Sequence, residues 1–287
     1  MKRNSLLILL FLLPFLSVMP QPKQNGRIPT REKRGYDLRK VIGNASIRIL
    51  YALNAKDVRN EDTYLDLGKL EVGQGISKYS SEFLSRSDRK AVQWKKTTKA
   101  KGNVPKSFWM GGLKTYKENW SELVFSEYFV KGNKLTEWAC MPLWAENNNG
   151  RYTEAWPLMR WNLHKEYLLI LGHRCQRATS RFRGNEFEAW FAPDIPFKGG
   201  PWKFGGLPGC ILKVQDLQKK YVWEAVAIDR GNFPILQYPE RLYPKTTRSR
   251  IWKLQKKYNA DYWNAIGMVW SDGHVSKRQK FSPIEKE

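Results

Sequence analysis

The residues most able to do chemistry are few and scattered in this sequence. Three histidines, His164, His173 and His274, lie outside any nucleophile, metal or phosphate-loop motif. His173 and Cys175 would share one face of a strand, and with a further sulfur ligand such as Cys140 they could bind a soft metal. We expect a structural role for these side chains instead, and we predict no metal site, no cofactor and no catalytic residues.

Carboxylates near the centre of the chain offer little for acid–base chemistry. Glu186 and Glu188 share one face of a predicted strand, opposite an aromatic residue, which favours solvent exposure over an acid/base pair. Asp194 precedes an Ile-Pro pair, a position typical of a turn or cap. A dispersed hydrolytic site would require Asp194, His173 or Glu154 to converge on one cleft.

The elements that would position these groups centre on residues 189–216, which indicate a strand, a rigid loop and a second strand. Pro193 and Pro196 end the first strand, because proline donates no backbone hydrogen bond. A structural turn follows, comprising Gly206, Leu207, Pro208 and Gly209. Its last three residues suit a type II turn, in which proline fixes φ at the first central position and glycine takes the positive φ at the second.

Large aromatic residues in this loop need an explanation, because Gly/Pro-rich loops are normally solvated. One interpretation is that the loop folds down as a lid and buries its rings in the core. The other is a ligand or partner surface formed by Trp190, Asp194, Phe197, Trp202 and Phe204. The second interpretation predicts that Trp202→Ala weakens binding while leaving the melting temperature nearly unchanged.

Short β-type runs recur along the rest of the chain. They predict strands near residues 47–51, 64–72, 123–130, 135–141, 167–171, 174–182, 185–192, 210–217 and 221–228. Gly132-Asn133 and Gly184-Asn185 supply tight hairpin turns. The pattern predicts a mostly β fold with a single antiparallel sheet, curved like the half-barrel of periplasmic lipoprotein carriers.

One amphipathic helix is predicted near the C-terminus. It follows Pro244, has Thr246 or Thr247 as its N-cap, and ends at Gly267. Its apolar stripe comprises Ile251, Leu254, Tyr258, Tyr262 and Ala265. The opposite face is cationic and is either solvated or a docking face. Residues 85–101 could form a short helix or a mobile loop, and the sequence does not decide between them.

Composition and the N-terminus set the wider expectations. The 287 residues are 41% hydrophobic, enough for a core, and carry a formal net charge of +23, which implies attraction to anionic surfaces. Two basic residues followed by the apolar run 6–16 predict a secretory signal peptide at residues 1–20, too short to span a bilayer. We expect export to the periplasm or cell surface, no transmembrane span and no nucleic-acid partner.

The domain organisation follows from shifts in composition. Residues 21–40 are basic and poor in large apolar side chains, so we predict a flexible basic leader. Residues 41–276 are predicted to form a single β-rich domain, and residues 277–287 a frayed tail.

Residues 206–211 (GLPGCI) closely resemble the hexapeptide that names the GLPGLI family, with Cys210 where that family usually has leucine. Residues 172–179 resemble another family segment, with His173 in place of tyrosine, and weaker similarity extends to most of the mature chain. The family comprises secreted envelope proteins of Gram-negative bacteria without an established activity, often considered alongside TonB-dependent outer-membrane receptors. The resemblance implies the same setting for this chain.

Three cysteines leave one unpaired in an oxidising compartment. We predict a Cys140–Cys175 disulfide, because Cys175 belongs to the family-like segment, and a buried free Cys210. The resulting functional hypothesis is a non-enzymatic, β-rich binding or accessory module linked to outer-membrane transport. Its partner would be a TonB-dependent receptor or a small apolar or anionic ligand. The alternative is an envelope hydrolase with a dispersed active site.

Overall fold

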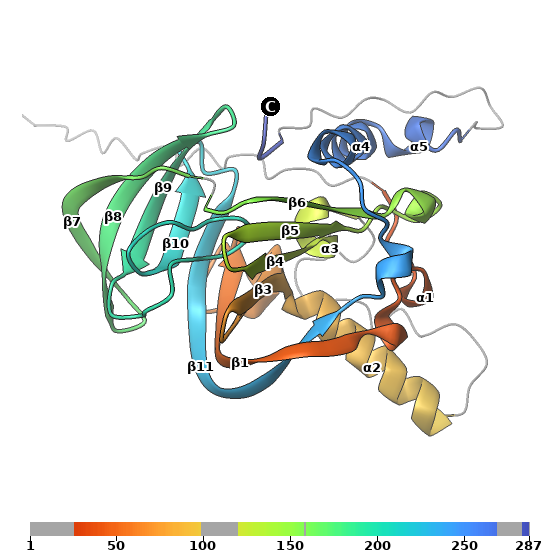
Figure 1. Ribbon diagram of the computed structural model, residues 1–287, viewed down its shortest axis with the longest axis horizontal. Coiled ribbons are helices and arrows are strands. Elements are labelled where there is room, and N and C mark those ends of the chain that lie inside the picture. The colour runs from red at the N-terminus through yellow and green to blue at the C-terminus, as the bar shows by residue number, and fades with distance from the viewer. Residues whose placement is uncertain (1–25, 99–119, 158, 269–282, 287) are drawn as a thin grey trace, which may run out of the picture.

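A single antiparallel sheet organises the molecule (Figure 1). The computed structural model describes residues 26–98, 120–157, 159–268 and 283–286. Eleven strands lie in the order β6-β5-β4-β3-β2-β1-β11-β10-β9-β8-β7, and the sheet is not closed. The strands are β1 (Lys40–Leu53), β2 (Asp66–Gly73), β3 (Ile76–Ser81), β4 (Glu127–Lys131), β5 (Lys134–Ala139), β6 (Gly150–Ala155), β7 (Asn162–Ile170), β8 (His173–Phe182), β9 (Asn185–Ala192), β10 (Cys210–Asp216) and β11 (Val222–Gln237). The predicted mostly β fold with one antiparallel sheet is confirmed.

The sheet consists of two meanders joined at one seam. Strands β1 to β6 follow one another from the centre to one edge, and β11 back to β7 follow one another to the other edge. The long strands β1 and β11 form the seam, with Tyr51 opposite Ala225 and Leu53 opposite Trp223. Register shifts along β1 bend both strands, because a bulge adds a residue on one side only. The seam is therefore long and strongly curved.

A short connector joins the two edge strands directly. The chain leaves β6 at Ala155 and enters β7 at Asn162. The seven Cα–Cα steps from Ala155 to Asn162 reach at most about 25 Å, so this connection limits how far apart the edges can lie. Trp161 donates from its indole nitrogen to the Gly205 carbonyl at 2.9 Å, so the connector also contacts the Gly-rich loop before β10.

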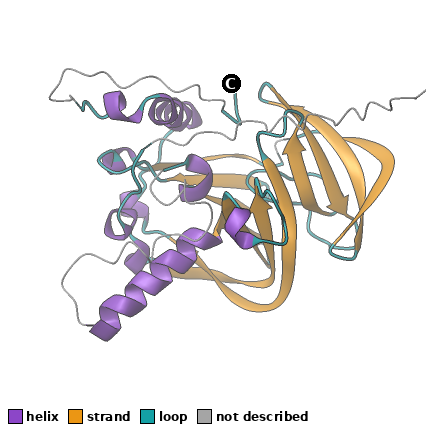
Figure 2. Ribbon diagram, turned by 180° about the vertical axis from the view of Figure 1, so that it is seen from behind, coloured by secondary structure: helices purple, strands orange, loops and turns teal. Residues whose placement is uncertain are grey.

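The helices gather around the β1–β6 half of the sheet, and Figure 2 shows the β7–β10 half without one. They are α1 (Arg31–Arg34), α2 (Glu82–Thr98), α3 (Glu122–Phe125), α4 (Arg248–Ala260) and α5 (Tyr262–Ala265). Helix α2 settles the region that the sequence left open, and its first residue Glu82 pairs with Lys69 of β2 at 3.0 Å. No helix in the described ranges combines the length and apolarity needed to cross a lipid bilayer.

The predicted C-terminal helix is confirmed as α4. The Thr247 side chain caps it by accepting from the Arg250 backbone N–H. Ile251 and Tyr258 of the predicted stripe are buried. The helix ends before the predicted Gly267, because Asp261 leaves helical geometry and caps the short helix α5.

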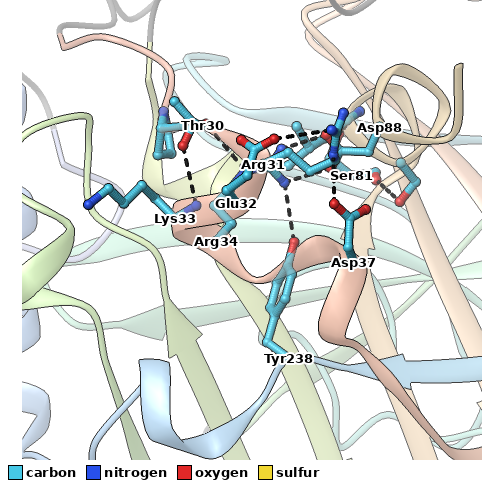
Figure 3. Close-up of polar contacts among 12 residues, drawn as sticks. Thr30, Arg31, Glu32, Lys33, Arg34, Asp37, Ser81, Asp88 and Tyr238 are labelled. Atoms are coloured by element: carbon cyan, nitrogen blue, oxygen red, sulfur yellow. Dashed lines mark hydrogen bonds and ion pairs between the residues drawn. The ribbon is translucent and has the colours of Figure 1, made fainter. Parts of the chain in front are cut away.

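The predicted flexible leader differs from the structure over residues 26–40. Helix α1 lies in this segment, and the guanidinium of Arg34 is buried against Asp88 of α2 (Figure 3). Two parallel bonds of 2.7 and 2.6 Å join the two groups, and Tyr238 lies 3.4 Å from the same guanidinium. This bidentate pair fixes the segment onto the fold. The predicted signal peptide and residues 21–25 lie outside the described residues.

The predicted frayed tail also differs where it is described. Residues 283–286 follow an ordered path, and Ile284 and Glu285 are buried. Asn185 at the start of β9 donates to the Ile284 carbonyl at 2.7 Å. A composition-based prediction treats charged terminal residues as solvated, whereas here the charges find buried partners.

Candidate functional site

The loop between β9 and β10 fills the hollow side of the sheet. Trp202 and Phe204 are 4% and 1% exposed. Trp202 lies within ring-contact distance of Tyr128 on β4, Phe182 on β8 and Trp223 on β11. The loop is therefore a lid with its rings in the core. The proposal that Trp202 and Phe204 form an exposed ligand surface is wrong, because core packing removes both rings from solvent.

The other residues of the predicted ligand surface do not form one patch. Trp190 and Phe197 are half-buried and pack against the core. Asp194 is exposed and contacts His173. Asp194 therefore lies beside His173 at the surface, whereas the four aromatic residues lie in the core or pack against it.

The structural turn is tight for a different reason from the one predicted. Gly206 has φ of +95°, the left-handed region that favours glycine, whereas Gly209 does not take the positive φ predicted for a type II turn. A Cβ atom on Gly209 would lie 2.2 Å from the Ala192 carbonyl oxygen. Gly209 is required by this close approach of two backbone segments, and Leu207 is buried beneath the turn.

A buried lysine in the same loop was not predicted. Lys203 is 3% exposed, and its ammonium lies 2.9 Å from Glu137 Oε2 and 2.8 Å from Glu285 Oε1. It also donates to the Tyr152 hydroxyl at 2.8 Å, which in turn donates to Glu137 at 2.7 Å. Burial would lower the pKa of Lys203, but the two carboxylates outweigh it and raise the pKa. The lysine stays charged and ties the loop to β5, β6 and the C-terminal segment.

A second buried carboxyl borders this cluster. Glu122 of α3 accepts from the Asn259 amide at 2.7 Å, and burial raises the pKa of Glu122 to about 7. Glu122, Glu137 and Lys203 line a hollow of about 20 Å³. This space holds no more than a water-sized molecule, so the cluster offers no room for a substrate while the C-terminal segment is in place.

The candidate hydrolytic residues converge only in part. His173 Nδ1 lies 2.6 Å from Asp194 Oδ2, an arrangement that orients an imidazole as in a base–carboxylate pair. Glu154 lies elsewhere and pairs with Arg183 at 2.5 Å. Asp194 is exposed, and this pair lines none of the five best-defined cavities among the described residues.

The cysteines are buried free thiols, so the structure does not contain the predicted Cys140–Cys175 disulfide. The prediction that Cys210 is buried and free agrees with the structure. Burial, with the nearby Asp194 carboxylate, raises the pKa of Cys175 to about 11. A nucleophilic thiol needs the opposite shift, so Cys175 does not complete a catalytic set with His173. In the described parts of the chain, no group of His, Cys, Asp and Glu residues is suited to hold a metal ion.

The edge strand β7 exposes a run of apolar side chains to solvent. Five of the twelve exposed large apolar side chains in the described residues lie in or just after this strand, which makes it the main apolar patch. They are Leu163, Tyr167, Leu168, Leu169 and Leu171, and Leu169 is 70% exposed. Strand β7 pairs with β8 on one side only. Its apolar run would suit a strand that is covered on both faces.

A groove begins where β7 ends. It has a volume of about 570 Å³ and lies between the end of β7 and the β1–β11 seam. Its apolar lining comprises Leu50, Val58, Leu67, Leu169, Leu171 and Val226, and Arg59, Glu61 and Glu224 add charge. Strand edge and groove together form a continuous surface, here called the β7 surface, of a size that admits side chains of an extended segment.

Comparison with known proteins gives a short match. A family model described as a protein of unknown function, Porph_ging, matches residues 176–213, which run from β8 to β10. No curated protein matches the chain. Solved structures of PNGF-II in the C2 and P21 space groups are similar over 74% of this chain, at 16% and 17% identity and a TM-score of 0.45. The chain spans about a third of the length of those structures, 33% and 34%. The 176–213 segment, which holds Lys203 and the Gly-rich turn, is thus similar to a family of unknown function.

Proposed function

We propose that this chain is an exported binding module of the cell envelope, which captures an extended segment of a partner protein on the β7 surface. The observation that carries the proposal is the exposure of an apolar strand at the edge of the sheet. Native proteins normally blunt such edges, because unpaired backbone groups recruit other strands. A partner segment pairing with β7 would satisfy those backbone groups and cover the apolar side chains.

The chemistry of the surface favours a particular partner. The side chains alternate across β7, so an added strand would meet apolar residues on both faces. Exposed charges of both signs lie alongside: Lys165 and Arg174 are exposed, and so is Glu166, which pairs with Arg177 at 3.2 Å. Arg174 stacks on Tyr167 at 3.7 Å. The net charge of +23 attracts acidic chains. The partner segment is therefore extended and rich in aliphatic residues, and the net charge of this chain favours a partner that is acidic overall.

The proposed cellular location and partner rest on the resemblance to the GLPGLI family. That resemblance supports export to the periplasm or surface of a Gram-negative bacterium and a TonB-dependent outer-membrane receptor as the partner. A carried small molecule is less well supported on the concave face, because Trp202 and Phe204 occupy it. The groove of about 570 Å³ is where a small apolar ligand would bind instead.

The test uses Leu169→Lys, a charge placed on the exposed edge. A photo-crosslinking residue at position 168 should capture one receptor-sized partner in intact cells, and Leu169→Lys should abolish that capture. Amide hydrogen exchange of residues 162–170 should slow in the purified complex. The melting temperature should stay within about 2 °C of the parent, because the side chain is already solvated.

The matched control is Leu217→Lys, which changes a leucine that is 54% exposed outside β7. It should leave capture unchanged. Unchanged capture by Leu169→Lys would overturn the proposal. Native mass spectrometry of gently purified protein separates the other outcomes: a small extra mass assigns the groove to a small ligand, and an exact dimer mass assigns β7 to a second copy.

The contact between His173 and Asp194 supports the hydrolase as a second candidate. Envelope extracts with His173→Ala should then lose an ester- or amide-cleaving activity that the parent has. Equal turnover by both proteins would leave only the binding function.

A further inference from the structure

The four described C-terminal residues, Pro283–Lys286, lie on the fold like a bound peptide. The Asn185 amide donates to the first two carbonyls of the segment, at 3.3 and 2.7 Å. The Trp252 indole of α4 donates to the third carbonyl at 3.0 Å. The backbone N–H of the fourth residue donates to the Arg183 carbonyl at 2.9 Å. The surrounding residues therefore satisfy the backbone of the segment along its length, as in recognition of an extended peptide.

The side chains of this segment also make specific contacts with the fold. Ile284 is buried. Glu285 Oε1 lies 2.8 Å from both Lys203 and Arg183, and its Oε2 lies 2.7 Å from Arg248. Burial alone would raise the pKa of Glu285, but the three cations outweigh it and lower the pKa to about 2. One carboxylate is thus shared by three cations from three different parts of the chain.

We propose that the surface of α4 and the β8–β9 turn that contacts Pro283–Lys286 is a binding site for an extended peptide in which an acidic residue follows an aliphatic one. The chain's own segment Pro283–Lys286 occupies this site. The site is distinct from the β7 surface and does not depend on it.

The three cations around Glu285 favour a site that recognises a peptide over contacts that only hold the segment in place. Replacing a buried ion pair by apolar residues of similar volume often leaves stability unchanged or raises it, so a segment held only for stability has no need of three cations around one carboxylate. Charge-assisted bonds add geometric selectivity for a carboxylate. Lys203 also contacts Glu137, and Arg183 also contacts Glu154, so both cations are held in position by residues outside the segment.

The test separates the segment from its site. A chain shortened to residues 1–281 is mixed with a fluorescent peptide of residues 282–287 (SPIEKE), and binding is followed by anisotropy. We expect saturable binding, at least about tenfold weaker when the peptide carries Glu285→Gln, because the charge-assisted bonds are lost. The full chain should bind the peptide far more weakly than the shortened chain, since its own segment fills the site.

A folded shortened chain, judged by circular dichroism, that binds neither peptide or binds both equally would overturn the proposal. Should the shortened chain not fold, the full chain with Glu285→Ala is used with acetate as the probe. Acetate should raise its melting temperature more than chloride at equal ionic strength. This difference should be clearly smaller in Asp62→Ala, which removes an exposed carboxylate and keeps only the general stabilising effect of acetate. An acetate–chloride difference that is no larger in Glu285→Ala than in Asp62→Ala would also overturn it.

Discussion

Lys203 shows how much one buried charge depends on distant partners. In the sequence it lies between the buried residues Trp202 and Phe204. Its carboxylate partners come from β5 and from the C-terminal segment. Lys203→Met keeps the volume but leaves Glu137 and Glu285 without their shared cation. We expect a loss of about 3–5 kcal/mol in the free energy of unfolding, measured by urea denaturation.

Arg59→Met is the matched control for Lys203→Met. Arg59 pairs with Asp57, and its side chain is 89% exposed, so its removal should cost less than about 1 kcal/mol. Similar losses in both variants would contradict the role given to Lys203.

The buried carboxyl of Glu122 leads to a prediction about how the stability of the protein depends on pH. Burial raises the pKa of Glu122 to about 7, above its value in the unfolded chain. The folded protein therefore holds a proton that the unfolded chain has released, and this contribution to stability is present below about pH 4 and is lost as the pH rises to about 7. Glu122→Gln should flatten the dependence of the free energy of unfolding on pH in this window. An unchanged slope between pH 4.5 and 7, with Glu240→Gln as the control, would show that Glu122 does not titrate there.

The Gly-rich turn before β10 carries the prediction at the level of elements. Gly209→Ala would force a Cβ against the Ala192 carbonyl, and a backbone atom has little room to move. We expect a cost of about 3 kcal/mol or more in thermal or urea unfolding. Gly172→Ala is the control, because Gly172 has φ of +82° but open space around it, so only the backbone strain of about 1 kcal/mol applies. Equal costs would mean that backbone conformation, not close approach, selects glycine at position 209.

Several elements were predictable because their signals are local. The runs 174–182 and 185–192 match β8 and β9 closely, and the helix cap at Thr247 was identifiable from the sequence. Helix α2 was not, because its residues are polar and its buried side depends on contacts with β2. The apolar run of β7 predicted a strand but not its exposure, since a strand's place at the edge is set by topology rather than by its own residues.

The candidate sites were less predictable than the elements. Arg34 looked like part of a solvated basic leader, yet its carboxylate partner Asp88 lies 54 positions later. Lys203 and Glu285 are 82 positions apart, and no local pattern marks either as buried. A charge that is neutralised across the fold has the same appearance in the sequence as one that faces water.

Trp202 should affect the stability of the whole molecule, because its ring contacts both halves of the sheet. Its ring lies 6.4 Å from Tyr128 on β4, 6.5 Å from Phe182 on β8 and 6.4 Å from Trp223 at the seam. Trp202→Ala should therefore lower the free energy of unfolding by about 3–5 kcal/mol, measured by urea denaturation. Trp144→Ala, which removes a ring that is 53% exposed, should cost little. A nearly unchanged melting temperature in Trp202→Ala would contradict this core role and would support the interpretation that Trp202 belongs to a ligand surface.

The seam between β1 and β11 also sets an order of events in folding. Within each meander every strand pairs with a neighbour in the chain, although α2 and α3 lie between β3 and β4. These pairings are more local than the seam and should form faster. The seam must wait until residues 222–237 have been made, because Tyr51 of β1 finds its partner only at Ala225. Until then β1 is a long strand with one side unpaired and open to aggregation. We expect closure of this seam to limit the folding rate, so a nascent chain that stops before β11 would depend on chaperones.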